Sequence, residues 1–352
     1  MRAGRAPRTA PGPGTLGRDR PLADAGPNGF FHPHPWLAGG HRQTLLGFWC
    51  RRSLRWTPPA SDLVVEAEEG VRLLLRTTWQ DGPREARPAL VIVHGLGGSD
   101  ASPYVVSTGL LAFARGWHVV RMNMRGAGDG EAACPRLYNA GLDSDLLAAV
   151  EAVARACPRV AVAAFSLGAS QALLMLGRRR ERLPEALCGV VAVCPPLDLA
   201  ACADRLAHPA NRLYQRYFMK ALREAYARRA RAHPELFEAG RERGTRTVRD
   251  YDEVITAPHG GYAGADDYYA RSSAGPWLAS VDRPALVLSA ADDPMIPIGS
   301  VAGWALPEGG MVRREITGTG GHVGFVGRSS APGFFCAAPR ALDFLEETVA
   351  GD

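Results

Sequence analysis

Short apolar runs alternate with stretches of helical spacing through most of this chain. The apolar, β-branched runs are typical of buried strands and lie at 89–93, 117–122, 159–165, 189–194, 284–290 and 311–316. Helical patterns follow several of them, at about 103–115, 143–156, 167–176 and 339–349. Two earlier runs, 63–67 and 71–79, flank Glu68-Glu-Gly70 and predict a β-hairpin. The alternation predicts an α/β fold, with a mostly parallel twisted sheet flanked by helices.

One long segment interrupts this alternation. Residues 197–281 are helical and polar in pattern, including a predicted helix over 211–231. An insertion between late strands predicts a helical cap over the carboxyl edge of the sheet, where open α/β folds hold their active sites. Residues 1–29 are rich in Arg, Pro, Gly and Ala and lack an apolar core. We therefore expect a disordered N-terminal extension, followed by one domain over 30–352.

Composition narrows the class of protein. Hydrophobic residues make up 46% and charged residues 22% of the 352 positions, as in globular proteins, and no apolar run could span a bilayer. The net charge is +5 and Lys220 is the only lysine, but no nucleic-acid recognition motif accompanies the arginines. Seven scattered cysteines without CxxC spacing predict reduced thiols in a cytoplasmic protein, with no disulfide framework and no zinc site.

Ser166 is the strongest candidate for a chemical role. It stands between the run 159–165 and the pattern of an amphipathic helix that begins at Leu167, with small residues, Ala164 and Gly168, two positions on either side. A strand-to-helix turn of this kind holds a serine in a strained, exposed position and is typical of a nucleophile. The same short pattern without the strand and the helix also occurs at Ser99, Ser170, Ser272 and Ser329.

A serine nucleophile needs a base and a group that orients the base. His322, in Gly320-Gly-His-Val-Gly324, follows the run ending at 316, and two carboxylates, Asp292 and Asp293, follow the run 284–290. The order Ser166, Asp293, His322 is the order of the α/β-hydrolase architecture. We favour Asp293 as the acid because Pro297 lies four residues later, and Asp292 remains the alternative.

An oxyanion hole is predicted from His94-Gly-Leu-Gly-Gly98. The glycines let the backbone turn so that the N–H of Leu96 faces the developing charge, while the N–H of Leu167 faces it from the start of the next helix. These glycines match neither GxxxxGK[ST] nor GxGxxG spacing, so we expect no nucleotide cofactor. His32, His34 and His41 lack a carboxylate or cysteine partner at ligand spacing. We expect a docked aromatic loop there, with no metal.

Together these residues resemble the α/β-hydrolase superfamily, and more narrowly its YheT-like branch of hydrolases and carboxylesterases. The narrower resemblance spans about residue 33 to the C-terminus and rests on the segments 34–45, 123–128, 138–146, 165–168, 256–262 and 267–269. Two departures are Ala164 and Ala169, where the branch often has glycine. Both are small, so the nucleophile is retained.

The resemblance implies a serine esterase that takes a small-molecule acyl ester, with no cofactor. Relatives in this superfamily include lipid-acyl hydrolases and enzymes that transfer an acyl group to an alcohol. Acyl transfer with the same triad is therefore the alternative function, and a non-catalytic binding module is a third. Peripheral contact with lipid or with a membrane is left open by the sequence, as are the physiological ester and the oligomeric state.

Overall fold

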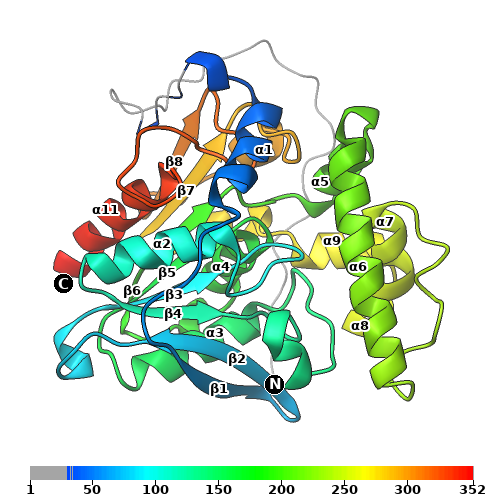
Figure 1. Ribbon diagram of the computed structural model, residues 1–352, viewed down its shortest axis with the longest axis horizontal. Helices are drawn as coiled ribbons and strands as arrows, with labels where there is room; N and C mark the ends of the chain where they lie inside the picture. Colours follow the sequence, from blue (N-terminus) through cyan, green and yellow to red (C-terminus); the bar gives the residue numbers. More distant parts are fainter. Residues whose placement is uncertain (1–29, 32, 34, 352) are drawn as a thin grey trace.

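The computed structural model describes residues 30–351 apart from 32 and 34 (Figure 1). The predicted extension 1–29, together with His32 and His34, lies outside the described residues. Eight strands form one sheet in the order β1-β2-β4-β3-β5-β6-β7-β8. Strand β2 pairs antiparallel with both β1 and β4, and every other neighbouring pair in this order is parallel. The strands are β1 Ser61–Glu68, β2 Val71–Thr78, β3 Ala89–Val93, β4 His118–Met122, β5 Val160–Phe165, β6 Leu187–Val193, β7 Ala285–Ala290 and β8 Val312–Thr317.

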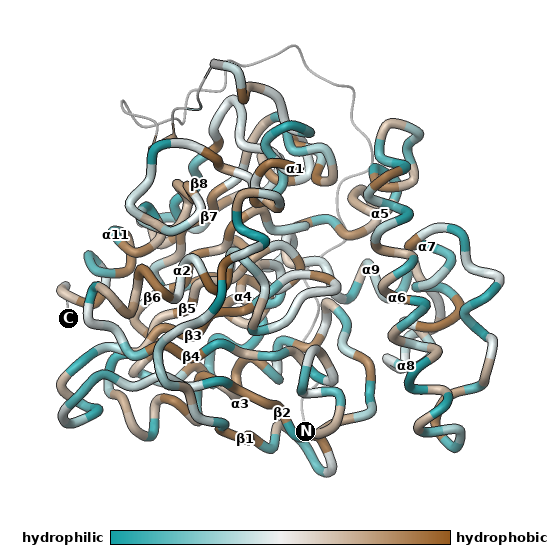
Figure 2. The backbone as a smooth tube through the Cα atoms, in the orientation of Figure 1, coloured by the Kyte–Doolittle hydropathy of each residue, from teal (hydrophilic) through white to brown (hydrophobic). Residues whose placement is uncertain are grey.

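The burial of the strands follows their sequence pattern. Every residue of β3, β5, β6 and β7 is buried, as expected for apolar runs covered on both faces. The edge strand β1 is mostly exposed and is joined to β2 through Gly70, whose φ of 73° suits a glycine. Figure 2 shows the hydrophobic positions gathered in the strands and in the helices against them. The α/β-hydrolase fold class predicted from the sequence is confirmed.

Helices cover both faces of the sheet. Helices α2 and α11 pack on one face, and α3 and α4 pack on the other (Figure 1). The α-helices are α1 Gly40–Arg51, α2 Pro103–Ala114, α3 Asp143–Ala154, α4 Leu167–Arg178, α5 Leu199–Ala207, α6 Arg212–Ala232, α7 Val248–Tyr251, α8 Ala257–Gly260, α9 Ala265–Ser272, α10 Gly299–Ala302 and α11 Ala337–Ala350. Short 3₁₀ segments are η1 Pro35–Leu37, η2 Arg84–Ala86, η3 Gly128–Ala132, η4 Arg180–Arg182, η5 Pro209–Asn211 and η7 Gly275–Ser280, and η6 Asp252–Thr256 is a π-helix.

The chain between β6 and β7 is helical. It contains α5 to α9, and Figure 1 shows α6, α7 and α8 standing to one side of the sheet. The short α7 begins with a capping box, because Thr247 and Asp250 each bond the other's backbone N–H. Within the described residues, no helix combines the length and the apolar character needed to cross a membrane.

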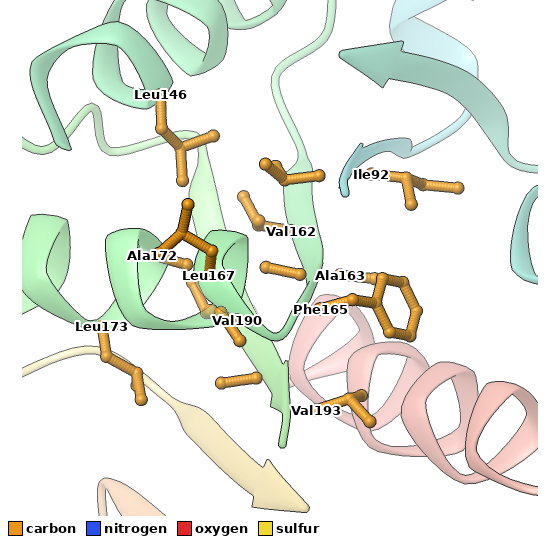
Figure 3. Packing of buried hydrophobic residues seen from close by; sticks show 14 of the residues in the cluster. Ile92, Leu146, Val162, Ala163, Phe165, Leu167, Ala172, Leu173, Val190 and Val193 are labelled. Carbon is orange, nitrogen blue, oxygen red and sulfur yellow. The ribbon is translucent and has the colours of Figure 1, made fainter. Parts of the chain in front are cut away.

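Two local expectations were wrong. The helix after Ser166 was expected to be amphipathic, but α4 is buried on all sides from Leu167 to Gly177, because α3 and η7 cover the side away from the sheet (Figure 3). The segment around Pro35 and Trp36 was expected to dock as an aromatic loop. Instead it forms η1 and leads into α1, and the Trp36 side chain is 81% exposed.

Candidate active site

Ser166 occupies a strained turn between β5 and α4. Its φ of 52° lies in the left-handed region, which a residue with a side chain adopts at a cost of about 1–3 kcal/mol. The turn is held because the Ser166 N–H donates to the Val193 carbonyl at 2.8 Å. Gly168 permits the close approach of the loop that follows β3, since a Cβ at residue 168 would lie 2.4 Å from the His94 carbonyl oxygen. Figure 3 shows Phe165 and Leu167 packed among buried residues on the two sides of this turn.

The structure brings Ser166, His322 and Asp293 together. Ser166 Oγ lies 2.8 Å from His322 Nε2, and His322 Nδ1 lies 2.8 Å from Asp293 Oδ2. The other carboxylate oxygen of Asp293 accepts from the N–H groups of Met295 and Ile296 at 2.8 and 3.1 Å. A carboxylate held in this way accepts a hydrogen bond from the Nδ1–H of His322, which leaves Nε2 free to accept the serine proton.

Asp292 has a different environment. Its Oδ2 lies 2.6 Å from Thr319 Oγ1, and its Oδ1 accepts from the Gly321 N–H at 2.9 Å. These two bonds tie the β7 exit loop to the loop that carries His322. Asp292 therefore holds the loop, while Asp293 contacts the imidazole.

Helix α1 clamps the His322 loop from the other side, a role that the sequence analysis missed. Thr44 Oγ1 accepts from the His322 N–H at 2.8 Å, and the Gln43 side chain bonds both the N–H and the carbonyl of Val326. The Arg51 guanidinium donates to the carbonyls of Val323 and Gly324 at 2.7 and 2.9 Å. The burial that this contact requires lowers the pKa of Arg51 to about 10. The only sequence signal was the unusual segment 34–45, which carries no chemistry by itself.

The loop after β3 presents the amide of Leu96. The amides of Gly95 and Gly97 donate to the hydroxyls of Tyr104 and Tyr138, at 2.9 and 2.7 Å. In the described part of the chain, the amides of Leu96 and Leu167 have no acceptor. Both residues line a cavity together with Ser166 and His322. Two preorganised N–H donors beside a nucleophile can stabilise a developing oxyanion.

The neutral imidazole of His94 holds this loop through hydrogen bonds. Burial lowers the pKa of His94 to about 4, so the ring is uncharged near neutral pH. Its Nε2 lies 3.1 Å from the Met124 N–H and accepts from it, so Nδ1 carries the proton and donates to the Gly95 carbonyl at 2.8 Å. The ring joins the loops that follow β3 and β4.

Two cavities meet at Ser166 and His322. One, of about 310 Å³, extends under the helices between β6 and β7 and is lined by apolar side chains together with polar groups that include Asp252, Tyr268 and Tyr269. The other, of about 410 Å³, runs between α1 and α6 and is lined mainly by apolar and aromatic side chains. An extended molecule could therefore place its centre at Ser166 and one arm in each cavity.

Asp252 is a buried acid in the first cavity. Its Oδ2 accepts from the Tyr269 hydroxyl at 2.7 Å, and burial raises the pKa of Asp252 to about 6. The residue begins the π-helix η6, a rare geometry that is common at functional sites. No motif in the sequence marks this carboxylate.

Cys194 lies beside the acid and the base. One ligand atom from each of Cys194, Asp293 and His322 lies within 4.8 Å of the others, a grouping that could hold a metal. Burial and the neighbouring Asp293 raise the pKa of the Cys194 thiol well above its usual range. The Cys194 Sγ already donates to the Gly321 carbonyl at 3.7 Å and accepts from the Val323 N–H at 3.4 Å. The Asp293 and His322 side chains also bond each other, so the donor set does not favour a metal.

Comparison with known proteins adds four findings. A model of the alpha/beta hydrolase fold family matches residues 88–328. The YheT protein of Escherichia coli (strain K12) is 32% identical, over 84% of this chain and 87% of its own length. Phospholipase ABHD3 of Mus musculus is 26% identical, over 84% of this chain and 73% of its own length. The solved esterase Pf2001 of Pyrococcus furiosus is 16% identical, with a TM-score of 0.54 over 84% of this chain and 96% of its own, a likeness of fold alone.

Proposed function

We propose that this chain, which belongs to the α/β hydrolase fold family and to its YheT-like branch, is a serine hydrolase that cleaves carboxylic esters. The observation that carries this proposal is the pair of 2.8 Å contacts that links Ser166 to His322 and His322 to Asp293. A serine hydroxyl becomes a useful nucleophile only with such a base and such an orienting acid.

The reaction proceeds in two halves. Ser166 Oγ attacks the acyl carbonyl while His322 Nε2 takes the hydroxyl proton, and Asp293 stabilises the resulting imidazolium. Collapse of the tetrahedral intermediate breaks the bond to the alcohol oxygen, which leaves with the proton from His322. Water then attacks the acyl-enzyme with His322 as base, and the carboxylic acid is released as Ser166 recovers its proton.

The Leu96 and Leu167 amides form the oxyanion hole of this proposal. Their lack of an acceptor among the described residues supports the assignment, because an amide already bonded to protein could not meet the substrate oxygen. Losing one such donor typically lowers kcat by about 10²–10³-fold.

The two cavities suggest how an ester is held. We assign the acyl chain to the more apolar cavity between α1 and α6, and the alcohol part to the more polar cavity that contains Asp252. Residues 197–281 then act as a cap that covers the cavity containing Asp252. Phospholipase ABHD3, by its name, acts on phospholipids, which supports a lipid-like acyl ester here. We propose that the protein acts in the cytoplasm, because all seven cysteines are free.

The test is active-site labelling with a serine control. Ser166→Ala should abolish turnover of short p-nitrophenyl esters and labelling by a fluorophosphonate, because no other hydroxyl contacts His322 Nε2 among the described residues. Ser170→Ala is the matched control, since that hydroxyl lies one helical turn away and donates to the Pro196 carbonyl instead. A wild-type protein that is not labelled, or a Ser166→Ala protein that is, contradicts the proposal.

Hydrolysis and acyl transfer are separated by the products. With an added alcohol, an acyltransferase forms the new ester in preference to the free acid, whereas a hydrolase releases mainly acid. Turnover across acyl-chain lengths then defines the class of ester.

A further inference from the structure

Helices α1 and α6 share an exposed apolar surface. It comprises Leu45, Phe48 and Trp49 of α1 and Leu213 and Tyr217 of α6, with exposed fractions between 52% and 68%. We call these five residues the α1–α6 patch. The two helices are neighbours, because the Phe48 and Tyr217 rings lie 6.5 Å apart, and Figure 1 shows the first half of α6 on the side of α1. Burying such side chains in an apolar medium is favourable, so a clustered patch indicates a binding surface.

Positive charge surrounds the patch. Arg42 on α1 and Arg212, Arg216 and Lys220 on α6 are exposed. The sequence contains no Asp or Glu over 40–60 or over 209–223. In the described part of the chain, neither Arg42 nor Arg212 nor Arg216 has a carboxylate within 4.0 Å, whereas Lys220 Nζ lies 3.9 Å from Glu224 Oε1. The surface therefore presents apolar side chains within a cationic rim.

The patch continues into the molecule. Leu45, Phe48, Leu213 and Tyr217 also line the 410 Å³ cavity, and the inner part of that cavity includes Ser166. An apolar chain that leaves a lipid layer at the patch could reach the nucleophile without crossing water.

We propose that the α1–α6 patch binds the surface of an anionic lipid bilayer, and that the cavity behind it receives the acyl chain of an ester lipid from that surface. Surface helices that combine aromatic or aliphatic anchors with Lys and Arg bind in this way, the anchors entering the acyl boundary and the cations pairing with anionic headgroups. The binding surface stands on the patch and its charge alone. Delivery of a substrate rests on the proposed function.

A second copy of this chain fits the surface less well than a lipid layer. A symmetric dimer through this surface would bring the same arginines of both copies together, because a two-fold interface pairs a patch with itself. A layer of anionic headgroups instead supplies the negative charge that pairs with the cationic rim.

The experiment measures partition onto vesicles by cosedimentation. The full chain carries Ser166→Ala so that no lipid is cleaved, and the vesicles are phosphatidylcholine alone or an equal mixture with phosphatidylglycerol. We expect binding to the mixed vesicles that weakens with added salt. Trp49→Ser should lower the partition coefficient about tenfold, and the double variant Arg216→Glu, Lys220→Glu should lower it about 30-fold or more.

Controls come from the β1–β2 hairpin, far from the patch in Figure 1. Val64→Ser removes an equally exposed apolar side chain, and Arg72→Glu reverses an exposed charge, so both should bind like the parent. In the chain with Ser166 intact, the Trp49, Arg216 and Lys220 variants should turn over a short soluble ester normally, because none of these residues lines either cavity. That turnover also shows that the variants fold.

Four results would overturn the inference. They are absence of binding to the anionic vesicles, binding that ignores salt, equal binding by patch and hairpin variants, and a dimer in sedimentation velocity that the patch variants dissociate. Binding is measured with Ser166→Ala, so it does not depend on catalysis. A failure of fluorophosphonate labelling would therefore refute the proposed chemistry but not the lipid-binding surface, and a failure of vesicle binding would refute the surface but not the chemistry.

Discussion

The two neighbouring carboxylates give the sharpest test of the site, because they have similar chemistry and different contacts. In Asp293→Asn, the side-chain oxygen stays with the amides of Met295 and Ile296, which need an acceptor. The new NH₂ then faces His322 Nδ1 and can only donate to it, which forces the ring proton onto Nε2. A protonated Nε2 cannot accept the proton of Ser166.

The expected loss follows from this wrong tautomer. Substitutions of this kind lower kcat by about 10⁴-fold, which corresponds to ~5 kcal/mol of transition-state stabilisation. Asp292→Asn should behave differently. Its oxygen can still accept from the Gly321 N–H, and its NH₂ can donate to Thr319 Oγ1, so both contacts survive without the charge. We expect a loss of about 1 kcal/mol, which is less than about tenfold in kcat.

The assay is kcat for a short p-nitrophenyl ester at saturating substrate, with thermal unfolding of each variant as the control for folding. Asp293→Asn should unfold near the parent temperature and be nearly inactive. If the two variants lose activity to the same extent, or if Asp292→Asn is the weaker enzyme, the assignment of Asp293 as the orienting acid is wrong.

Three further predictions follow from the local geometry. Gly95→Ala would place a Cβ 2.9 Å from the Ser166 Cβ, and displacing the nucleophile should lower kcat about 10²-fold while the protein stays folded by circular dichroism. Thr44→Val removes the acceptor of the His322 N–H, so kcat should fall more than KM rises, and Thr44→Ser should restore it. Asp252 has a folded pKa of about 6, above the usual unfolded value, so its burial costs stability as pH rises through 4 to 6, by about 3 kcal/mol above that range. Asp252→Asn escapes this cost, so the variant should gain stability relative to the parent between pH 4 and pH 8, measured as a larger free energy of unfolding. An equal difference between variant and parent at both pH values would contradict the reasoning.

The parallel sheet was predictable because a strand buried on both faces needs an unbroken apolar run. The run 89–93 coincides with β3, and the runs 284–290 and 311–316 agree with β7 and β8 to within a residue or so. The same logic placed Ser166, Asp293 and His322 after strand ends, since parallel strands bring their carboxyl ends to one edge. Their catalytic roles and the cap boundaries 197–281 stay predictions.

The burial of α4, and the partners that its polar side chains find there, were less predictable. The pattern of α4 suggested one polar face, but the positions that looked polar, Ser170 and Gln171, bond carbonyls of other loops at Pro196 and Asn139. A polar side chain with a fixed internal partner can be buried without a large penalty. No periodicity within the helix reports where that partner lies.

The sequence by itself determined the order of strands and helices along the chain and the strand-to-helix turn at Ser166. It also determined the small set of acids and bases that could activate this serine, because all these features depend on short-range patterns of burial and spacing. Only the tertiary structure decided that Asp293 and not Asp292 contacts His322, and that Thr44 and Arg51 of α1 hold the His322 loop from some 270 positions away. It also decided that α1 and α6 expose their apolar sides together. Contacts of this kind depend on how whole elements pack in space, and adjacent residues of equal chemistry are distinguished only by the direction in which the folded backbone points them.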